Sequence, residues 1–273
     1  MESQYIELLQ HLLCSGKERA TRNGTVKSIF GATLECDLAD GFPLLTTKKM
    51  FWRGIVEELS WFLRGSTNVQ ELREKKVHIW DGNSEHRHYD AGPVYGFQWR
   101  HFGAEYSDCY ADYTGKGHDQ IASILHLLKT DPHSRRMVLS AWCPAQQDQM
   151  CLPPCHIMYQ FYVEDDERVS CMMTQRSADV FLGLPFNIAS TALLTHLIAH
   201  QVGRKPGRLM IQVGDVHIYE EHYNACREQL ERTSMLLPSI QILRKSENLY
   251  FNVEDIVLMN YKSHGRLKAP MKT

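Results

Sequence analysis

The stretch FNIASTALLTHLIAHQV, residues 186–202, is the longest apolar segment of the chain. Apolar residues occupy nearly every side of a helix built from it, which predicts a helix that is buried all round rather than one that lies on the surface. Asn187, His196 and His200 interrupt the segment, so it is not expected to span a membrane. We therefore expect it to form the central buried helix of the fold.

The rest of the chain alternates between helical and extended patterns around this segment. Apolar residues at three- and four-residue steps predict a helix over Phe51–Leu63 that stops at Gly65. Residues Asp81–Tyr113, rich in Gly, His, Asp and Tyr, are expected to form a long irregular excursion. Further helices are predicted at Tyr5–Leu13, Gln120–Lys129 and Ile218–Arg232, and strands at Lys27–Leu38, Met137–Cys143, Ile157–Val163, Val169–Gln175, Leu209–Val213 and Ile240–Leu243.

This order of elements predicts an α+β fold with a large mixed or antiparallel sheet packed by helices. No linker, internal repeat or low-complexity tract divides the 273 residues. A single layered domain is therefore expected over residues 1–273.

Composition excludes several classes of protein. A formal net charge of −2 gives no overall attraction to nucleic acid or membrane, so any anion site must be local. The start of the chain has no basic region ahead of an apolar stretch, which argues against a secretory signal. The eight cysteines lack a compact disulfide spacing and indicate reduced thiols in the cytoplasm, with the nucleus or an organelle as alternatives. All of them except Cys155 are expected to be buried as small hydrophobic residues.

Cys155 lies in the run LPPCH, residues 152–156, shortly before QRSADVFLGLPFN, residues 175–187. A thiol with a free pKa near roughly 8.5 becomes a better nucleophile when a guanidinium favours the thiolate, so Cys155 near Arg176 is predicted to be a catalytic nucleophile. His156 is a poor base for it, because adjacent residues of a strand point to opposite faces. A zinc site made by Cys143, Cys151, Cys155 and His156 fits no common ligand spacing.

The two runs, in this order and in phase with further matches along nearly the whole chain, closely resemble thymidylate synthases. The resemblance implies the fold of that family and the reductive methylation of deoxyuridylate (dUMP) to thymidylate (dTMP). In such enzymes the cysteine attacks C6 of dUMP, and 5,10-methylenetetrahydrofolate is both one-carbon donor and reductant and leaves as dihydrofolate. No metal or nicotinamide is needed.

A set of arginines fits the phosphate of dUMP, because guanidinium forks bind a phosphate dianion bidentately. In the family, the matches of Arg22, Arg176 and Ser177 bind the phosphate in their own subunit. The matches of Arg135 and Arg136 reach in from the partner subunit. The resemblance therefore implies a homodimer.

Other positions match the residues that read the base and the sugar. Asn187 offers a donor and an acceptor, which suits a neutral uracil, whereas an aspartate there would favour cytosine. The alternative is that Asn187 only caps the following helix. Gln175 belongs to the same set by resemblance, and His217 and Tyr219 match the ribose-hydroxyl binders.

The resemblance also supplies acid–base and folate residues. Glu58 matches the glutamate that manages protons through ordered water, although periodicity alone does not choose between Glu57 and Glu58. Burial beside aromatic residues would raise the pKa of Glu58 toward neutrality. Tyr95 matches the tyrosine associated with loss of the C5 proton. The folate set consists of Lys48, Trp80, Asp179, Leu182, Gly183, Phe186 and Ala269.

Three departures from the family pattern stand out. The loop around Arg22 is one residue shorter than usual, Asn83 stands where bacterial members have tryptophan, and the tail ends in Lys272 and Thr273 instead of small apolar residues. The tail closes over folate in the family, so closure is expected to be weaker here. Two alternatives follow: a dUMP or dCMP hydroxymethylase of the same fold, and a catalytically idle RNA-binding homologue.

Overall fold

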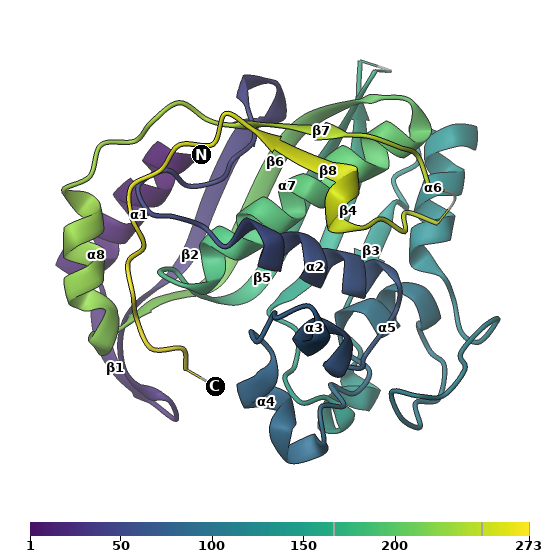
Figure 1. The fold of residues 1–273 in the computed structure, drawn as a ribbon, viewed down its shortest axis with the longest axis horizontal. Coiled ribbons are helices and arrows are strands. Elements are labelled where there is room, and N and C mark those ends of the chain that lie inside the picture. Colours follow the sequence, from purple (N-terminus) through teal and green to yellow (C-terminus); the bar gives the residue numbers. More distant parts are fainter. Residues whose placement is uncertain (166, 247, 273) are drawn as a thin grey trace.

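A six-stranded sheet forms the centre of the molecule (Figure 1). The structure is a computed structural model, and it describes residues 1–165, 167–246 and 248–272. The strand order is β1-β2-β6-β5-β4-β3, and neighbours are antiparallel except β5 and β6, which are parallel. The strands are β1 (Lys17–Thr21), β2 (Gly24–Asp37), β3 (Val138–Ser140), β4 (His156–Glu164), β5 (Arg168–Asp179) and β6 (Lys205–Tyr219).

The long apolar segment forms α7 (Gly183–Val202), the crossover helix between the two parallel strands. It packs on β5 and β6, and α2 (Trp52–Leu63) packs on α7 in turn (Figure 1). Most of α7 is buried on every side, as its composition predicts. The other helices are α1 (Glu2–Ser15), α3 (Gln70–Glu74), α4 (Asp81–Ser84), α5 (Tyr95–His101), α6 (Gln120–Thr130) and α8 (Tyr223–Leu230).

The α+β class and the mixed sheet are confirmed. One large cluster of buried hydrophobic residues runs from Tyr5 to Ile256, which supports the prediction of a single domain. The C-terminal part of the chain forms a separate two-stranded ribbon, β7 (Ser239–Ile242) with β8 (Ile256–Met259). In the described part of the chain, no helix is long and apolar enough to cross a bilayer.

Several predicted boundaries are wrong. The helix expected over Ile218–Arg232 begins only at Tyr223, because β6 continues to Tyr219. The excursion over Asp81–Tyr113 contains two short helices, α4 and α5. Strands β1 and β8 were not predicted, and β3 is shorter than the predicted run.

The expected burial of seven cysteines is also wrong. Only Cys171 and Cys226 are buried, Cys14 is exposed, and the remaining five, including Cys155, are partly exposed. All eight are free thiols.

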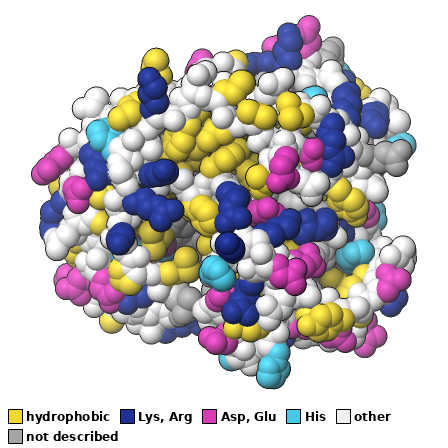
Figure 2. All heavy atoms as spheres, in the orientation of Figure 1, with side chains coloured by type: hydrophobic (Ala, Val, Ile, Leu, Met, Phe, Trp, Pro, Cys, Tyr) yellow, Lys and Arg dark blue, Asp and Glu magenta, His cyan; other side chains and the backbone are white. Residues whose placement is uncertain are grey.

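The surface seen in Figure 2 mixes both signs of charge. Lys and Arg side chains gather across the middle of this face with acidic side chains among them, below a patch of hydrophobic side chains (Figure 2). This view shows no broad field of one sign, in keeping with the net charge of −2.

Candidate active site

A cavity of about 620 Å³ opens where β5 and β6 approach the start of α7. This volume suits a ligand of nucleotide or folate size. It brings together residues that are up to 251 positions apart in the sequence, from Thr21 to Lys272. The predicted site residues that line it are Arg22, Glu58, Trp80, Tyr95, Cys155, Gln175, Arg176, Ser177, Asp179, Leu182, Gly183, Phe186, Asn187, His217 and Tyr219.

Cys155 is held at the cavity wall by its own backbone. Its N–H donates to the Tyr95 hydroxyl over 2.7 Å, and its carbonyl accepts from the N–H of Arg176 over 2.8 Å. The Arg176 guanidinium donates to the carbonyls of Pro154 (2.8 Å) and Pro153 (2.9 Å). Arg176 therefore fixes the loop that carries the thiol.

The electrostatics of Cys155 differ from the prediction. Burial raises the pKa of the thiol, and the nearby Arg176 guanidinium and Tyr95 hydroxyl only partly offset it. The predicted net lowering of this pKa by Arg176 is therefore wrong, because desolvation outweighs the attraction. The sulfur is held mainly as a thiol near neutral pH.

His156 also lines the cavity, against the expectation that it would point away. The reason is that β4 begins only at His156, so Cys155 lies outside the alternation of the strand. The Nδ1 atom of His156 lies 2.7 Å from the Tyr159 hydroxyl, and burial lowers its pKa to about 3. A histidine this hard to protonate is still a poor base for Cys155.

The side chains of Glu58 and Glu57 leave α2 toward different neighbours. Glu58 lines the cavity, where its Oε1 accepts from the Trp80 indole Nε1–H over 2.7 Å. Burial raises the pKa of Glu58 to about 7, although the Trp80 hydrogen bond opposes that rise. Glu57 instead accepts from Lys75 Nζ over 2.6 Å. The choice that periodicity leaves open is thus made by the geometry of the fold.

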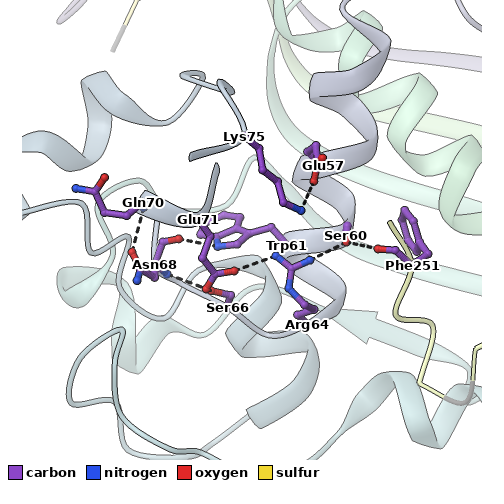
Figure 3. A network of polar contacts seen from close by, with 10 residues as sticks. All are labelled: Glu57, Ser60, Trp61, Arg64, Ser66, Asn68, Gln70, Glu71, Lys75 and Phe251. Atoms are coloured by element: carbon purple, nitrogen blue, oxygen red, sulfur yellow. Dashed lines mark hydrogen bonds and ion pairs between the residues drawn. The ribbon is translucent and has the colours of Figure 1, made fainter. Parts of the chain in front are cut away.

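A network of polar contacts joins α2 to neighbouring segments (Figure 3). The Ser60 hydroxyl donates to the carbonyl of Phe251 over 2.7 Å, and Arg64 donates both to Ser60 and to Glu71. Together with the pair between Glu57 and Lys75, these bonds join α2 to α3 and to the segment before β8 (Figure 3). They fix the rotation of α2 that turns Glu58 inward.

Tyr95, from α5, lines the cavity and contacts two other rings. Its ring centroid lies 4.7 Å from that of Phe62 and 4.3 Å from that of His156. Burial raises its pKa well above the ordinary value. The phenol is therefore protonated throughout the physiological range, with its oxygen on the backbone of Cys155.

Asn187 is the fifth residue of α7, so it does not cap the helix. Its Oδ1 accepts from Gln175 Nε2 over 2.9 Å, and the same Gln175 nitrogen donates to the carbonyl of Ser177. These bonds fix the direction of the amide at the cavity wall. The alternative that Asn187 serves only as a helix cap is excluded.

Asp179 caps the turn into α7 and contacts a histidine that sequence reasoning missed. Its Oδ1 accepts from the N–H groups of Phe181 (2.9 Å) and Leu182 (3.2 Å), and it lies 3.6 Å from Nδ1 of His222. Burial alone would lower the pKa of His222, but Asp179 and the carbonyl of Pro270 outweigh it and raise that pKa. No spacing in the sequence indicates this contact, because His222 and Asp179 meet only through the fold.

The C-terminal tail reaches the cavity, where Met271 and Lys272 form part of the wall. His222 Nε2 lies 2.8 Å from the carbonyl oxygen of Pro270, and Lys272 Nζ donates to Oε1 of Glu221 over 2.5 Å. Two neighbouring residues, Glu221 and His222, thus fasten the tail. Asn83, another departure from the family pattern, also lines the cavity.

Four predicted site residues lie outside the cavity. Lys48 is buried, donates from Nζ to the carbonyl of Phe181, and has its pKa lowered by burial to about 8. Ala269 packs against the core just before the tail residues of the wall. Arg135 and Arg136 lie exposed on the turn before β3. Within one chain, therefore, only Arg22 and Arg176 of the predicted arginine set reach the cavity.

Among the described residues, no group of three or more His, Cys, Asp and Glu side chains is arranged to hold a metal ion. Cys143, Cys151 and Cys155 are all partly exposed free thiols.

Comparison with known proteins matches residues 3–273 to the family model described as thymidylate synthase. The chain is 47% identical over 283 residues to the human protein named thymidylate synthase, and the match covers 99% of this chain and 90% of the relative. It is 47% identical to the thymidylate synthase of human herpesvirus 8 type P, isolate GK18, covering 99% of this chain and 84% of the relative.

A third relative is the bifunctional dihydrofolate reductase-thymidylate synthase of Zea mays. It is 46% identical over 283 residues, and the match covers 99% of this chain and 54% of that protein. The chain thus spans little more than half of the maize relative. None of these three relatives is named a hydroxymethylase or an RNA-binding protein, so neither alternative gains support.

Proposed function

The chain belongs to the thymidylate synthase family, and on that premise we propose that it converts dUMP to dTMP by reductive methylation. As a member of this family it is a methyltransferase. The co-substrate is 5,10-methylenetetrahydrofolate, which supplies the one-carbon unit and the hydride and leaves as dihydrofolate. The observation that carries this proposal is the convergence of Cys155, Glu58 and Asn187 on one cavity with Arg22 and Arg176 at its wall.

In the first step, Cys155 adds to C6 of the pyrimidine. The S–C6 bond forms, the C5–C6 double bond opens, and negative charge moves to O4. Because burial holds Cys155 as a thiol, its proton must pass to solvent, to which the residue is partly exposed, as the nucleotide binds. Arg176 is the cation that favours the thiolate. Asn187 and the carboxyl of Glu58, whose pKa is about 7, are suited to donate to the charged oxygen.

In the second step, C5 attacks the one-carbon unit and then loses its proton. Tyr95 is the group proposed to assist that loss, and its contact with the backbone of Cys155 ties it to the nucleophile. Loss of this proton expels tetrahydrofolate as its remaining bond to the one-carbon unit breaks, which leaves an exocyclic methylene on C5. Hydride transfer from the tetrahydrofolate to this methylene completes the methyl group and gives dihydrofolate, and the S–C6 bond breaks to release dTMP. The thiol returns to its starting state.

The folate is proposed to lie against Trp80, Leu182, Gly183 and Phe186, with Asp179 accepting hydrogen bonds from the pterin ring. The tail that includes Ala269 would close over it. Lys48 must leave the carbonyl of Phe181 to reach an anionic glutamate of the folate. Desolvation makes the buried ammonium costly, which favours such a movement once an anion is present.

We propose that the active form is a homodimer in which Arg135 and Arg136 complete the phosphate site of the partner. Two observations support this. Both arginines are exposed and lie outside the cavity of their own chain. The face of the sheet opposite the core carries Tyr162, 62% exposed, and the partly exposed Met158 and Met172, three apolar side chains that a second copy could cover.

Gln175, Ser177, His217 and Tyr219 complete the proposed nucleotide set, and their places in the cavity wall support it. A cytoplasmic location and a role in dTMP biosynthesis complete the proposal.

A spectrophotometric assay for dihydrofolate tests the reaction. With dUMP and methylenetetrahydrofolate, the protein should form dihydrofolate and a product with the mass of dTMP. With dCMP it should form neither. A product heavier by about one oxygen, formed without dihydrofolate, would identify a hydroxymethylase, in which water captures the methylene. Salt-dependent RNA binding without any turnover would instead favour the idle homologue.

A further inference from the structure

Asp215 holds two functional parts of the cavity wall at once. Its Oδ1 lies 2.8 Å from Nδ1 of His217, and its Oδ2 accepts from a guanidinium nitrogen of Arg19 over 2.9 Å. Asp215 itself lines the cavity.

The strand geometry explains why Asp215 and His217 meet. They are two residues apart on β6, so their side chains leave the same face, as does that of Tyr219. In the parallel register, Asp215 lies beside Ser177 and His217 beside Asp179 of β5. The carboxylate therefore stands within the row of residues proposed to contact the sugar and the phosphate.

The contact with a carboxylate selects one tautomer of His217. A carboxylate can only accept, so Nδ1 of His217 must carry the hydrogen. In the neutral ring the other nitrogen, Nε2, is then an acceptor. A sugar hydroxyl that meets Nε2 can donate to it, and the opposite tautomer would have no lone pair to offer.

The second oxygen of Asp215 reaches a different element. Arg19 belongs to β1, which forms a hairpin with β2, and Arg22 stands in the turn between the two strands. Arg19 also donates to the hydroxyl of Ser28 on β2 over 3.4 Å. Strand β2 of this hairpin already pairs with β6 along its backbone, and the pair between Arg19 and Asp215 adds a side-chain link from β1 to β6.

We propose that Asp215 is a positioning residue for the nucleotide, which fixes the acceptor tautomer of His217 and ties the Arg22 hairpin to the same carboxylate. This inference rests on the proposed function, because the sugar and the phosphate belong to dUMP. One side chain then contacts both the histidine proposed to bind the sugar and the hairpin that carries the phosphate-binding Arg22.

The two arms of Asp215 contribute unequally. The Arg19 and Asp215 side chains are 59% and 35% exposed, and a pair so open to solvent contributes little. His217 is only 12% exposed, so its bond to the carboxylate is the stronger constraint. Removal of Asp215 is therefore expected to act mainly through His217, and removal of Arg19 mainly through the hairpin.

Histidine-labelled protein tests the tautomer directly. Long-range ¹⁵N–¹H NMR spectra at a pH where His217 is neutral should give the pattern of an Nδ1–H ring, with the signal assigned from the spectrum of His217→Gln. Asp215→Asn keeps an acceptor oxygen and should keep this pattern, whereas Asp215→Ala should lose it. An unchanged pattern in Asp215→Ala would overturn the proposal.

Binding of two nucleotides tests the consequence. Asp215→Ala should weaken the binding of dUMP by about tenfold, as expected for the loss of one buried hydrogen bond. It should weaken the binding of 2′,3′-dideoxyuridylate, which lacks the 3′-hydroxyl, by only about twofold. Arg19→Ala should weaken the binding of both nucleotides by about twofold. It should leave the binding of deoxyuridine, which has no phosphate, unchanged. Equal weakening of both nucleotides by Asp215→Ala would contradict the role assigned to His217.

Glu167→Ala is the matched control, because it removes a carboxylate from an exposed ion pair with Lys205 on the same sheet, outside the cavity. It should leave all three affinities unchanged. Thermal unfolding of each variant separates misfolding from lost positioning, and Asp215→Asn supplies a folded variant if Asp215→Ala unfolds. Wild-type protein that fails to bind dUMP would sink the proposed function, while the NMR result still decides the contact between Asp215 and His217.

Discussion

The indole nitrogen of Trp80 donates a 2.7 Å hydrogen bond to Oε1 of Glu58. Trp80, a residue of the apolar cavity wall, therefore orients the carboxyl group of Glu58. Burial pushes the pKa of Glu58 up to about 7 and this bond pulls against it, so the carboxyl can exchange a proton near neutral pH.

Glu58→Gln should stabilise the fold at high pH while it impairs turnover. Burial raises the pKa of Glu58 from 4.5 to about 7, so ionisation between these values costs the folded protein about 3 kcal/mol at most. The cost is absent below pH 4.5 and complete above pH 7. Urea unfolding should show equal stabilities near pH 4.5 and a more stable variant at pH 8. A difference independent of pH would contradict the burial of an ionisable Glu58.

Asn187→Asp should change which pyrimidine is bound. The amide both donates and accepts, whereas a carboxylate only accepts and suits the amino group of cytosine. Because Gln175 already donates to Oδ1, an aspartate fits the same place. We expect kcat/KM for dUMP to fall by about a hundredfold or more, and dCMP to become the tighter ligand. Isothermal titration with both nucleotides checks this, and unchanged preference would refute the assignment of Asn187 to the base.

Much of the fold could be predicted because its long elements carry strong periodic signals. The helix predicted over Phe51–Leu63 matches α2 to within one residue, and the buried helix α7 begins only three residues before its predicted start. The missed start includes Pro185, which a first helical turn tolerates because its N–H would have no partner there. The local pattern of apolar residues is enough to predict a helix where the helix is long and its buried side is continuous.

Short elements were missed because tertiary contacts, not local pattern, form them. Helix α5 contains Gly96, and a Cβ there would lie 2.5 Å from the carbonyl oxygen of Phe62, so the helix exists through close packing on α2. In the site, fifteen of the residues named by the motif matches line one cavity. They do not reveal that Lys48 points into the core or that His222 and Asp215 hold their neighbours, because those facts depend on packing between distant segments.

Mixing two inactive variants tests the shared phosphate site. In a dimer of Cys155→Ala with Arg136→Ala, one cavity carries both defects and the other carries none. Random exchange of equal amounts should restore about a quarter of the wild-type activity, since half the dimers are mixed and each has one intact site. Activity measured after gentle denaturation and refolding of the mixture checks this. No recovery, with dimers present by light scattering, would mean that Arg136 acts in its own chain.

Lys272→Glu should loosen the tail. It places a second negative charge beside Glu221, which now accepts from Lys272. The pair is partly exposed, so we expect KM for the folate to rise about two- to fivefold, with little change in KM for dUMP. The double variant Glu221→Lys with Lys272→Glu restores opposite charges and should recover most of the loss. Equal KM values in all three proteins would show that this pair does not hold the tail.

The central claim is that the Cys155 sulfur bonds to C6 of the pyrimidine, and the mass of the intact protein tests it most directly. A fluorine at C5 cannot leave as a proton, so 5-fluorodeoxyuridylate with methylenetetrahydrofolate should stop the reaction at the covalent stage. Wild-type protein should then gain the mass of both molecules, and Cys155→Ser should gain none while still binding dUMP. An adduct of the same mass on Cys155→Ser, or steady turnover of dUMP by that variant, would contradict the account.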